Sequence, residues 1–359
     1  MSSASVSPQI DEAAQQAFIG TMLGDVGATL TGALVLIGDR LGLYKALAEQ
    51  GPLTSAQLAE KTGTHERYVR EWLSNQAASG YLTYDPATKA FTLPPEHAPM
   101  LADDSSPFMM CGLFEIGQTL YVDEPQITEA FKTGKGFGWH EHDRRLFSAT
   151  ERFFRPGYNA NIVANWIPAL DGVDAKLRAG AKVADVGCGL GTSTILMARA
   201  YPKSRFHGFD YHAGSIALAR AAAERAGVAD RVSFEVAPAQ SFPGKGYDFV
   251  ACFDCIHDMG DPVGAAAHIR SALADDGTFM MVEPYANDAL EDNLNPVGRI
   301  FYAASTMLCT PASLSQEVGL GLGAQAGEAA LRAVFNEASY TRFRRATETP
   351  FNLVFEARP

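Results

Sequence analysis

The sequence predicts an α/β protein in which a doubly wound parallel sheet follows a mainly helical N-terminal half. From Lys182 onward, short apolar runs alternate with segments of helical spacing, which is typical of parallel strands joined by helices. A glycine-rich turn, "GCGLG", joins the first of these runs to a helix. Because 359 residues are enough for two domains, we expect one over residues 1–165 and the other over residues 166–359.

The charge of the chain argues against nucleic acid and membrane surfaces as partners. Asp and Glu outnumber Lys and Arg by 41 to 29, so the average surface repels phosphates. We expect no secretion signal, because the first residues have neither a basic nor an apolar region. Asp39, Arg40 and Lys45 interrupt the most apolar segment. We therefore expect a cytoplasmic protein, with that segment forming a buried helix or the helix of a homodimer.

The N-terminal half is expected to contain a winged helix. Apolar residues recur at helical spacing over residues 18–50, and Gly51-Pro52 ends that helix. Residues 53–93 then fit a helix, a turn, a second helix and a two-stranded wing. The expected capping and turn residues are Thr54 or Ser55, Gly63, Thr64 and Asp85-Pro86.

A winged helix either binds DNA or serves as a scaffold for dimerisation. On the segment that would be the recognition helix, Glu66 and Glu71 offset the two arginines, Arg67 and Arg70. No net basic stripe is left for phosphates. Dimerisation is therefore the favoured role, and a transcriptional regulator that uses the second domain as a ligand sensor is the alternative.

Seven strand-like runs are expected in the C-terminal half. Five of them alternate with helices and predict parallel strands with right-handed crossovers. The last two, "YTRFRRA" and "NLVFEA", flank Thr349-Pro350 and predict a hairpin that closes one edge of the sheet.

The segment "VADVGCGLGTS" predicts a cofactor site. Asp185 precedes Gly187, Gly189 and Gly191, and open parallel sheets bind ligands beyond the carboxyl ends of their central strands. The spacing differs from the G-x-G-x-x-G pattern that receives a pyrophosphate, and a carboxylate would repel that group. Asp185 would instead help to hold an ammonium, such as that of S-adenosyl-L-methionine.

Asp210, at the end of the second expected strand, is placed to accept both hydroxyls of an adenosine ribose. Enzymes that use NAD carry an acid at the same point, so a nicotinamide oxidoreductase is an alternative. Four further residues are expected around the adenosine or on a face of the ligand: Tyr211, Ala239, Gln240 and Phe253.

No metal site is predicted. His140 and His142 lie in an expected loop without a third defined ligand, so we expect them to face solvent or substrate. Cys252 and Cys255 stand three apart in a strand-like run, where they would point to opposite faces and could not share a metal.

With Asp185, Gly187, Gly189 and Asp210 in this strand order, the chain resembles the class I S-adenosylmethionine-dependent methyltransferases over residues 175–359. The resemblance implies a Rossmann-like, seven-stranded sheet whose last strand is antiparallel. It also implies S-adenosyl-L-methionine as the cofactor and S-adenosyl-L-homocysteine as the product.

The segment "CIHDMGDP" resembles the "HDW" segment of small-molecule O-methyltransferases that carry an N-terminal winged-helix domain. In that family the domain forms dimers and roofs the active site. Carried over by position, His257 would be the general base and Asp258 a substrate contact. Glu283 would orient His257, and Tyr158 would line the cofactor pocket. Met259 stands where the family has tryptophan.

We therefore predict methyl transfer to a small molecule, aromatic or apolar, with a hydroxyl as the favoured acceptor. Such a transfer is an in-line displacement that depends mainly on positioning. The hydroxyl proton needs a base, and a neutral histidine is the usual one. Two alternatives stay open: methylation of nitrogen or carbon, in which His257 need not be a base, and a His257 that only caps its strand.

Overall fold

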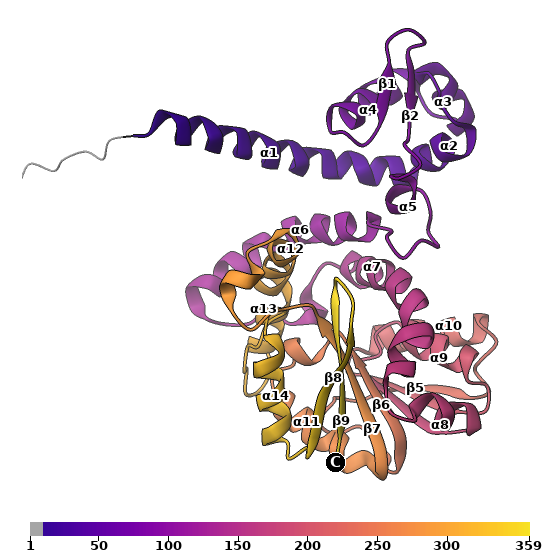
Figure 1. Cartoon of the computed structure of the whole chain (residues 1–359), viewed down its shortest axis with the longest axis vertical. Coiled ribbons are helices and arrows are strands. Elements are labelled where there is room, and N and C mark those ends of the chain that lie inside the picture. Colours follow the sequence, from indigo (N-terminus) through magenta and orange to yellow (C-terminus); the bar gives the residue numbers. More distant parts are fainter. Residues whose placement is uncertain (1–9) are drawn as a thin grey trace, which may run out of the picture. The chain divides into compact units, whose positions relative to one another are not determined.

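The computed structural model describes residues 10–359, which form two compact units that divide between Glu115 and Ile116. The boundary that we expect between residues 165 and 166 is a different one. It separates a dimerisation domain from a catalytic domain, and it stays a prediction. The first unit is mainly helical (Figure 1). Its elements are α1 (Glu12–Arg40), α2 (Leu43–Gln50), α3 (Ser55–Thr62), α4 (Glu66–Ala78), β1 (Thr83–Asp85), β2 (Ala90–Thr92), α5 (Ala98–Leu101) and the first turn of α6 (Cys111–Thr133).

Helices α3 and α4 with the β1–β2 pair form the predicted winged helix, and local signals set its boundaries. Thr54 begins α3 through a capping box, in which its N–H donates to Gln57 Oε1 at 2.9 Å. His65 caps α4, so the expectation of Thr64 is wrong by one residue. Asp85 forms the wing turn, since its Oδ1 accepts from the N–H two residues ahead at 2.9 Å.

Helix α1 packs against α4 at one end and is exposed along the rest of its length. Trp72 Nε1 donates to the Leu34 carbonyl at 2.8 Å. Farther toward its start, Phe18, Leu23 and Leu30 are 64%, 69% and 67% exposed. Within the described part of the chain, α1 alone is long and apolar enough to cross a membrane by length and composition. Apolar helices of proteins without a membrane segment meet the same criterion.

The second unit contains the sheet and the helices that cover it (Figure 1). Its elements before the sheet are the rest of α6, η1 (Trp139–Glu141), α7 (Arg145–Asn161), the π-helix η2 (Ile162–Trp166), η3 (Ile167–Ala169) and α8 (Val173–Ala179). The sheet and its connections follow as β3 (Lys182–Val186), α9 (Thr192–Ala200), β4 (Arg205–Asp210), α10 (Ala213–Arg225), β5 (Val232–Val236), β6 (Tyr247–Phe253), η4 (Ile256–Asp258), α11 (Pro262–Ala272) and β7 (Leu273–Pro284). The last elements are η5 (Leu290–Asn293), α12 (Pro296–Ala304), the π-helix η6 (Ser305–Cys309), α13 (Thr310–Leu314), α14 (Gly327–Glu337), β8 (Arg342–Glu348) and β9 (Asn352–Arg358).

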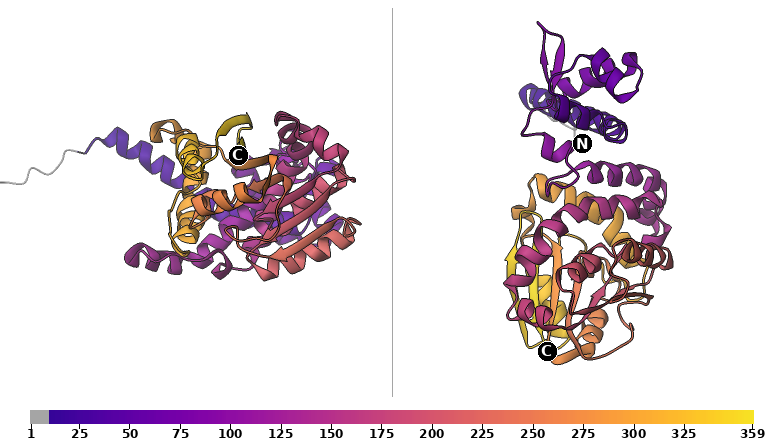
Figure 2. Two further views of the ribbon diagram at one scale, coloured as in Figure 1. Left: turned by 90° about the horizontal axis from the view of Figure 1, so that it is seen from below. Right: turned by 90° about the vertical axis from the view of Figure 1, so that its right-hand side faces the viewer.

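The seven strands lie in the order β5-β4-β3-β6-β7-β9-β8, and β9 alone runs antiparallel to the other six. The predicted hairpin at one edge is therefore confirmed. Alternate side chains enter two cores, because Val183 packs with α9 and α10 whereas Ala184 packs with α11 and α14. Helices cover both faces of the sheet, as Figure 2 also shows, which is the doubly wound arrangement that the sequence predicts.

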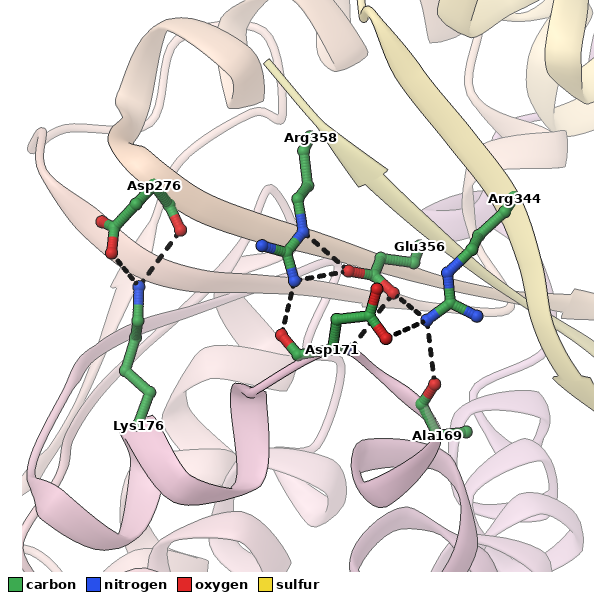
Figure 3. A network of polar contacts seen from close by, with 7 residues as sticks. All are labelled: Ala169, Asp171, Lys176, Asp276, Arg344, Glu356 and Arg358. Atoms are coloured by element: carbon green, nitrogen blue, oxygen red, sulfur yellow. Dashed lines mark hydrogen bonds and ion pairs between the residues drawn. The ribbon is translucent and has the colours of Figure 1, made fainter.

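A charged network fixes the β8–β9 hairpin to the segment before α8 (Figure 3). The Glu356 side chain is 3% exposed and pairs with Arg344 and Arg358. Arg344 Nη2 also donates to Asp171 Oδ1 at 3.0 Å and to the Ala169 carbonyl at 3.1 Å. Because one buried carboxylate meets two guanidinium groups, the pairing offsets the cost of its burial. The network lies toward the amino end of β7. The carboxyl ends of the parallel strands, where a ligand is expected, lie at the other end of the sheet.

Candidate active site

The glycine loop follows the carboxyl end of β3. Gly187, Gly189 and Gly191 have φ values of 74°, 51° and 81°, which glycine adopts without strain. A Cβ at Gly187 would lie 2.7 Å from Cys255 Sγ, so a larger residue would displace the segment after β6. The loop leads directly into α9, whose first N–H groups lack helical partners. The loop therefore offers open backbone to a ligand at the edge of the sheet.

Asp185 lies beneath this loop and is 1% exposed. Its Oδ2 accepts hydrogen bonds from Ser193 Oγ at 2.6 Å and Thr194 Oγ1 at 2.5 Å. Its Oδ1 is buried and has no partner among residues 10–359. Burial raises the pKa of Asp185 to about 6, since the hydroxyl donors only partly compensate for lost hydration. An unpaired buried acceptor of this kind fits a cationic donor from a ligand.

Asp210 ends β4 and joins that strand to the glycine loop. Its Oδ2 accepts from the Gly189 N–H at 2.9 Å, and its Oδ1 accepts from the His212 N–H at 2.8 Å. Burial raises its pKa. The segment after β5 lies beside it, because the Ala237 N–H donates to the Asp210 carbonyl at 3.0 Å. Tyr211 follows β4, and Ala239 and Gln240 follow β5, so all three lie beyond the carboxyl ends of two adjacent parallel strands.

The end of β6 carries an aromatic cluster and a strained aspartate. The Phe253 ring lies 5.3 Å from the Tyr158 ring. Tyr158 OH donates to Asp254 Oδ2 at 2.9 Å, and Asn352 Nδ2 donates to Asp254 Oδ1 at 3.2 Å. Asp254 has a φ of 50°, which is uncommon for a residue with a side chain. Such strain is typical of functional sites, and sequence reasoning missed Asp254 although it follows Phe253 directly.

His257 and Glu283 form a buried pair at the carboxyl ends of β6 and β7. His257 Nδ1 lies 2.5 Å from Glu283 Oε2, and Glu283 Oε1 accepts from the Ile256 N–H at 3.0 Å. The Cys309 thiol is a further hydrogen-bond partner of His257. Burial acts to lower the pKa of His257, but Glu283 and then Cys309 outweigh it and hold this pKa well above its usual value.

The two halves of the site meet through Asp258. Burial raises its pKa to about 7, and both Glu283 and Asp210 act in the same direction. Asp258 in turn helps burial to raise the pKa of Tyr211. Asp258 therefore lies between the His257–Glu283 pair and the end of β4.

The charge balance of the site fits a ligand with positive charge. The site holds five carboxyl groups, Asp185, Asp210, Asp254, Asp258 and Glu283, and only two imidazoles act on them: His257 on Asp254, Asp258 and Glu283, and His212 on Asp210. Burial raises the pKa of Asp254 to about 7, as it does for Asp258. A cation among these groups would stabilise their charged forms. S-adenosyl-L-methionine carries both an ammonium and a sulfonium, so the residues present fit this cofactor.

Two expectations about cysteine and histidine need correction. Cys252 and Cys255 share a hydrogen bond, because β6 ends at Phe253 and Cys255 lies beyond the alternation of the strand. The prediction that they point apart is therefore wrong. His142 is 3% exposed and hydrogen-bonded to Asp123, so it does not face solvent. Among residues 10–359, no group of three or more His, Cys, Asp or Glu could hold a metal ion.

Family models match both parts of the chain. Residues 177–331 match the model described as a methyltransferase domain, and residues 29–103 match that of an Rv2258c-like winged HTH domain. An uncharacterized protein of Synechococcus sp. is 33% identical over 99 residues, which are 27% of this chain and 24% of that protein. This chain thus spans about a quarter of the length of that relative.

Solved structures share the fold over the whole length. The mitomycin 7-O-methyltransferase MmcR has a TM-score of 0.69 at 20% identity, with 97% of this chain and 100% of that chain covered. Human N-acetylserotonin methyltransferase, solved in complex with SAM, has a TM-score of 0.69 at 16% identity, with 98% and 99% covered. At these identities the likeness concerns the fold, and it confirms a mainly helical N-terminal part followed by the seven-stranded sheet.

Proposed function

Since the chain has a methyltransferase domain at residues 177–331 and a winged helix-turn-helix domain at residues 29–103, we propose that it transfers a methyl group from S-adenosyl-L-methionine to a hydroxyl of a small molecule. The observation that carries this proposal is the His257–Glu283 pair. It lies at the same edge of the sheet as the glycine loop, because β3, β6 and β7 are parallel.

The cofactor would be held by the edge of the sheet between β4 and β6. Gly187 and Gly189 offer open backbone, Asp185 Oδ1 would accept from the ammonium, and Asp210 would accept from the ribose hydroxyls. The residues that would surround the rest of the cofactor are Tyr158, Tyr211, Ala239, Gln240 and Phe253. When bound, S-adenosyl-L-methionine supplies a methyl group that is activated by the sulfonium.

His257 would remove the proton of the acceptor hydroxyl. Its Nδ1 hydrogen bond to Glu283 fixes the ring, and Nε2 would take the proton once the acceptor hydroxyl replaces the Cys309 thiol as a partner of the ring. Without a ligand, Glu283 and then Cys309 keep the imidazole protonated, because they hold its pKa well above the usual value. A cation near Asp254 and Asp258 counteracts those carboxylates, so it would lower this pKa and favour the neutral form that can act as a base. Asp258 would contact the acceptor.

Aromatic side chains support an aromatic or apolar acceptor. The segment after α6 contains three aromatic side chains, Phe137, Trp139 and Phe147. It contacts the end of β4, because the His140 ring lies beside the Tyr211 ring and the Phe147 ring stacks on the His212 ring with 4.6 Å between their centroids. Such a lining favours flat apolar molecules with few polar groups. Small molecules also stand in the names of the two solved relatives, mitomycin 7-O-methyltransferase and N-acetylserotonin methyltransferase.

Calorimetry and product mass test the proposal. We expect S-adenosyl-L-homocysteine to bind to the full chain, and a mass increase of one methyl group when phenols are supplied with S-adenosyl-L-methionine. A chain that binds neither S-adenosyl-L-methionine nor S-adenosyl-L-homocysteine would overturn it. A Gly187→Val variant is the matched control, because a side chain there collides with Cys255 and should abolish binding.

The raised pKa of His257 favours a second candidate, which is methylation of nitrogen or carbon. A protonated imidazole cannot take a proton, and a neutral amine already carries the lone pair that attacks. A panel of matched phenols and amines distinguishes the two. Methylated amines together with full turnover by His257→Ala would replace the hydroxyl with nitrogen as the acceptor.

We also propose a cytoplasmic homodimer formed through α1. The exposed apolar side chains of Phe18, Leu23 and Leu30 would be covered by a second copy. Sedimentation velocity should show a dimer that Leu23→Asp converts to a monomer, while Phe131→Asp, at an exposed site on α6, has no effect. Association with lipid vesicles instead of self-association would contradict this assignment.

DNA binding is not part of the proposal, because the arginines of α4 are paired with acids. Arg67 lies 2.5 Å from Glu71, and Arg70 lies 2.7 Å from Glu66. Little positive charge is left to displace counterions from a phosphate backbone. Retardation of a promoter fragment at physiological salt, with release by the cofactor, would favour a regulator instead.

A further inference from the structure

A second buried histidine–carboxylate pair lies outside the site described above. His142 Nδ1 lies 2.8 Å from Asp123 Oδ2, and the Asp143 N–H donates to both Asp123 oxygens at 3.3 Å. Both side chains of the pair are almost fully buried. His142 Nε2 is buried as well and has no hydrogen-bond partner within residues 10–359.

The protonation state of His142 makes Nε2 an acceptor. Burial lowers the pKa of His142 and outweighs Asp123 and Glu141, which act to raise it. The ring is therefore neutral at neutral pH, with its one N–H on Nδ1 donated to the Asp123 carboxylate. Nε2 then holds a lone pair without a donor, and a buried acceptor without a donor is rare in folded proteins.

Aromatic rings surround this acceptor. The Phe137 ring meets the His142 ring edge-on at 4.6 Å, and the Trp139 ring lies 6.2 Å away. Trp139 in turn packs against Phe147 at 5.8 Å. One polar atom in an aromatic wall is the usual composition of a site that orients a flat ligand.

The segment that carries His142 touches both halves of the candidate active site. The His140 ring lies 6.0 Å from the Tyr211 ring, beside the end of β4. The Phe137 N–H donates to the Pro311 carbonyl at 2.9 Å. Pro311 lies two residues after Cys309, the thiol that contacts His257. Residues 137–142 thus extend from the cofactor end of the sheet to the segment that covers His257.

We propose that His142 Nε2 accepts a hydrogen bond from an O–H or N–H group of the methyl acceptor, at a point remote from the atom that is methylated. The acceptor is then an aromatic molecule with a second polar donor, and His142, oriented by Asp123, is a specificity-determining residue. This inference rests on the proposed methyl transfer. Because Nε2 is closed to solvent, residues 134–143 must move when the acceptor enters.

Nitrogen NMR on the full chain tests the inference without turnover. With S-adenosyl-L-homocysteine bound, ¹⁵N spectra are recorded as resorcinol is added, and again with 3-methoxyphenol, which keeps one hydroxyl and has no second donor. We expect resorcinol to shift the His142 Nε2 resonance in the direction of hydrogen bonding and 3-methoxyphenol to leave it unchanged. His142→Phe keeps a ring of similar size without the acceptor, and it identifies the resonance.

A kinetic test uses an acceptor found by product mass and its analogue without the second donor. The wild-type enzyme should prefer the acceptor with the donor by roughly tenfold in kcat/KM, as expected for one neutral hydrogen bond. The preference should disappear in His142→Phe and persist in His142→Gln, whose amide oxygen can still accept. A merely structural role would change stability and not this preference.

The outcomes separate this inference from the proposed function. Failure of S-adenosyl-L-homocysteine to bind overturns the proposed function, and this inference falls with it. Bound S-adenosyl-L-homocysteine together with a His142 resonance that resorcinol does not move, up to the solubility limit of resorcinol, overturns this inference alone. The same holds if His142→Phe keeps the preference for the acceptor with the second donor.

Discussion

The two buried histidine–carboxylate pairs of the second unit have the same geometry and opposite chemistry. In both, Nδ1 meets a carboxylate, at 2.5 Å for His257–Glu283 and 2.8 Å for His142–Asp123. The pKa of His257 is held well above its usual value, whereas that of His142 is lowered. The difference lies in the surroundings. Asp254 and Asp258 add negative charge around His257, and aromatic rings surround His142.

A hydrogen-bonded carboxylate does not by itself decide the charge of a histidine. Desolvation opposes the imidazolium at both positions; Glu283 and Cys309 outweigh it at His257, whereas Asp123 and Glu141 do not outweigh it at His142. A protonated and a neutral histidine thus stand in one unit, each suited to a different role in binding and transferring protons.

Replacement of His257 should have the largest effect. We expect His257→Ala to lower kcat by about 10²- to 10⁴-fold on a hydroxyl acceptor, as for loss of a general base. Steady-state kinetics measure this, and calorimetry with S-adenosyl-L-homocysteine should show unchanged affinity. Nearly full turnover by the variant would show that His257 is not the base and only caps its strand. The two histidines would then no longer differ in their roles.

Replacement of Asp258 should change how the stability of the ligand-free protein depends on pH. The folded-state pKa of Asp258 is raised to about 7, above the unfolded value of about 3.9. Its contribution to stability is therefore complete below pH 4 and is lost as the pH rises through 7. Asp258→Asn cannot ionise, so it should lose less stability over this range, by about 4 kcal/mol.

Denaturant unfolding at several pH values measures this effect. A pH dependence of Asp258→Asn that follows the wild type would show that Asp258 is already ionised in the folded state.

The charge of the ligand should have the smallest effect, which we expect on the pKa of His257 and not on that of His142. Sinefungin carries an amine in place of the sulfonium, whereas S-adenosyl-L-homocysteine has a neutral thioether. We expect sinefungin to lower the pKa of His257 by about one unit more, since it adds a cation beside the acids. NMR titration of both histidines measures this. The His142 resonance should respond equally to the two ligands, and an equal response of His257 would count against the electrostatic account.

Local patterns were sufficient to predict much of the sheet and of the cofactor loop. Strand alternation, the spacing of Asp185 from Gly187 and Gly189, and the Thr349-Pro350 turn are each visible within a dozen residues. Glu283 was assigned to His257 through a family resemblance, and the structure places the two in contact. The roles of these residues stay predictions.

Contacts between residues far apart in the sequence could not be predicted. Asp123 lies 19 residues before His142 on a helix whose burial no local pattern reveals. Asp254 is met by Tyr158 and Asn352, which are 96 and 98 residues away. The Cys252–Cys255 contact was misjudged for a different reason, since alternation applies only as far as the strand extends and β6 ends at Phe253.

Asp254, in its left-handed conformation, connects three elements of the second unit. Tyr158 from α7 and Asn352 from β9 hold the side chain, while its N–H donates to the Val282 carbonyl of β7 at 2.8 Å. A strained residue keeps its conformation only while its neighbours enforce it. A displacement of α7 or of β9 would therefore change the backbone at Asp254 and, three residues along the chain, the position of His257. Neither element needs to touch a substrate to have this effect.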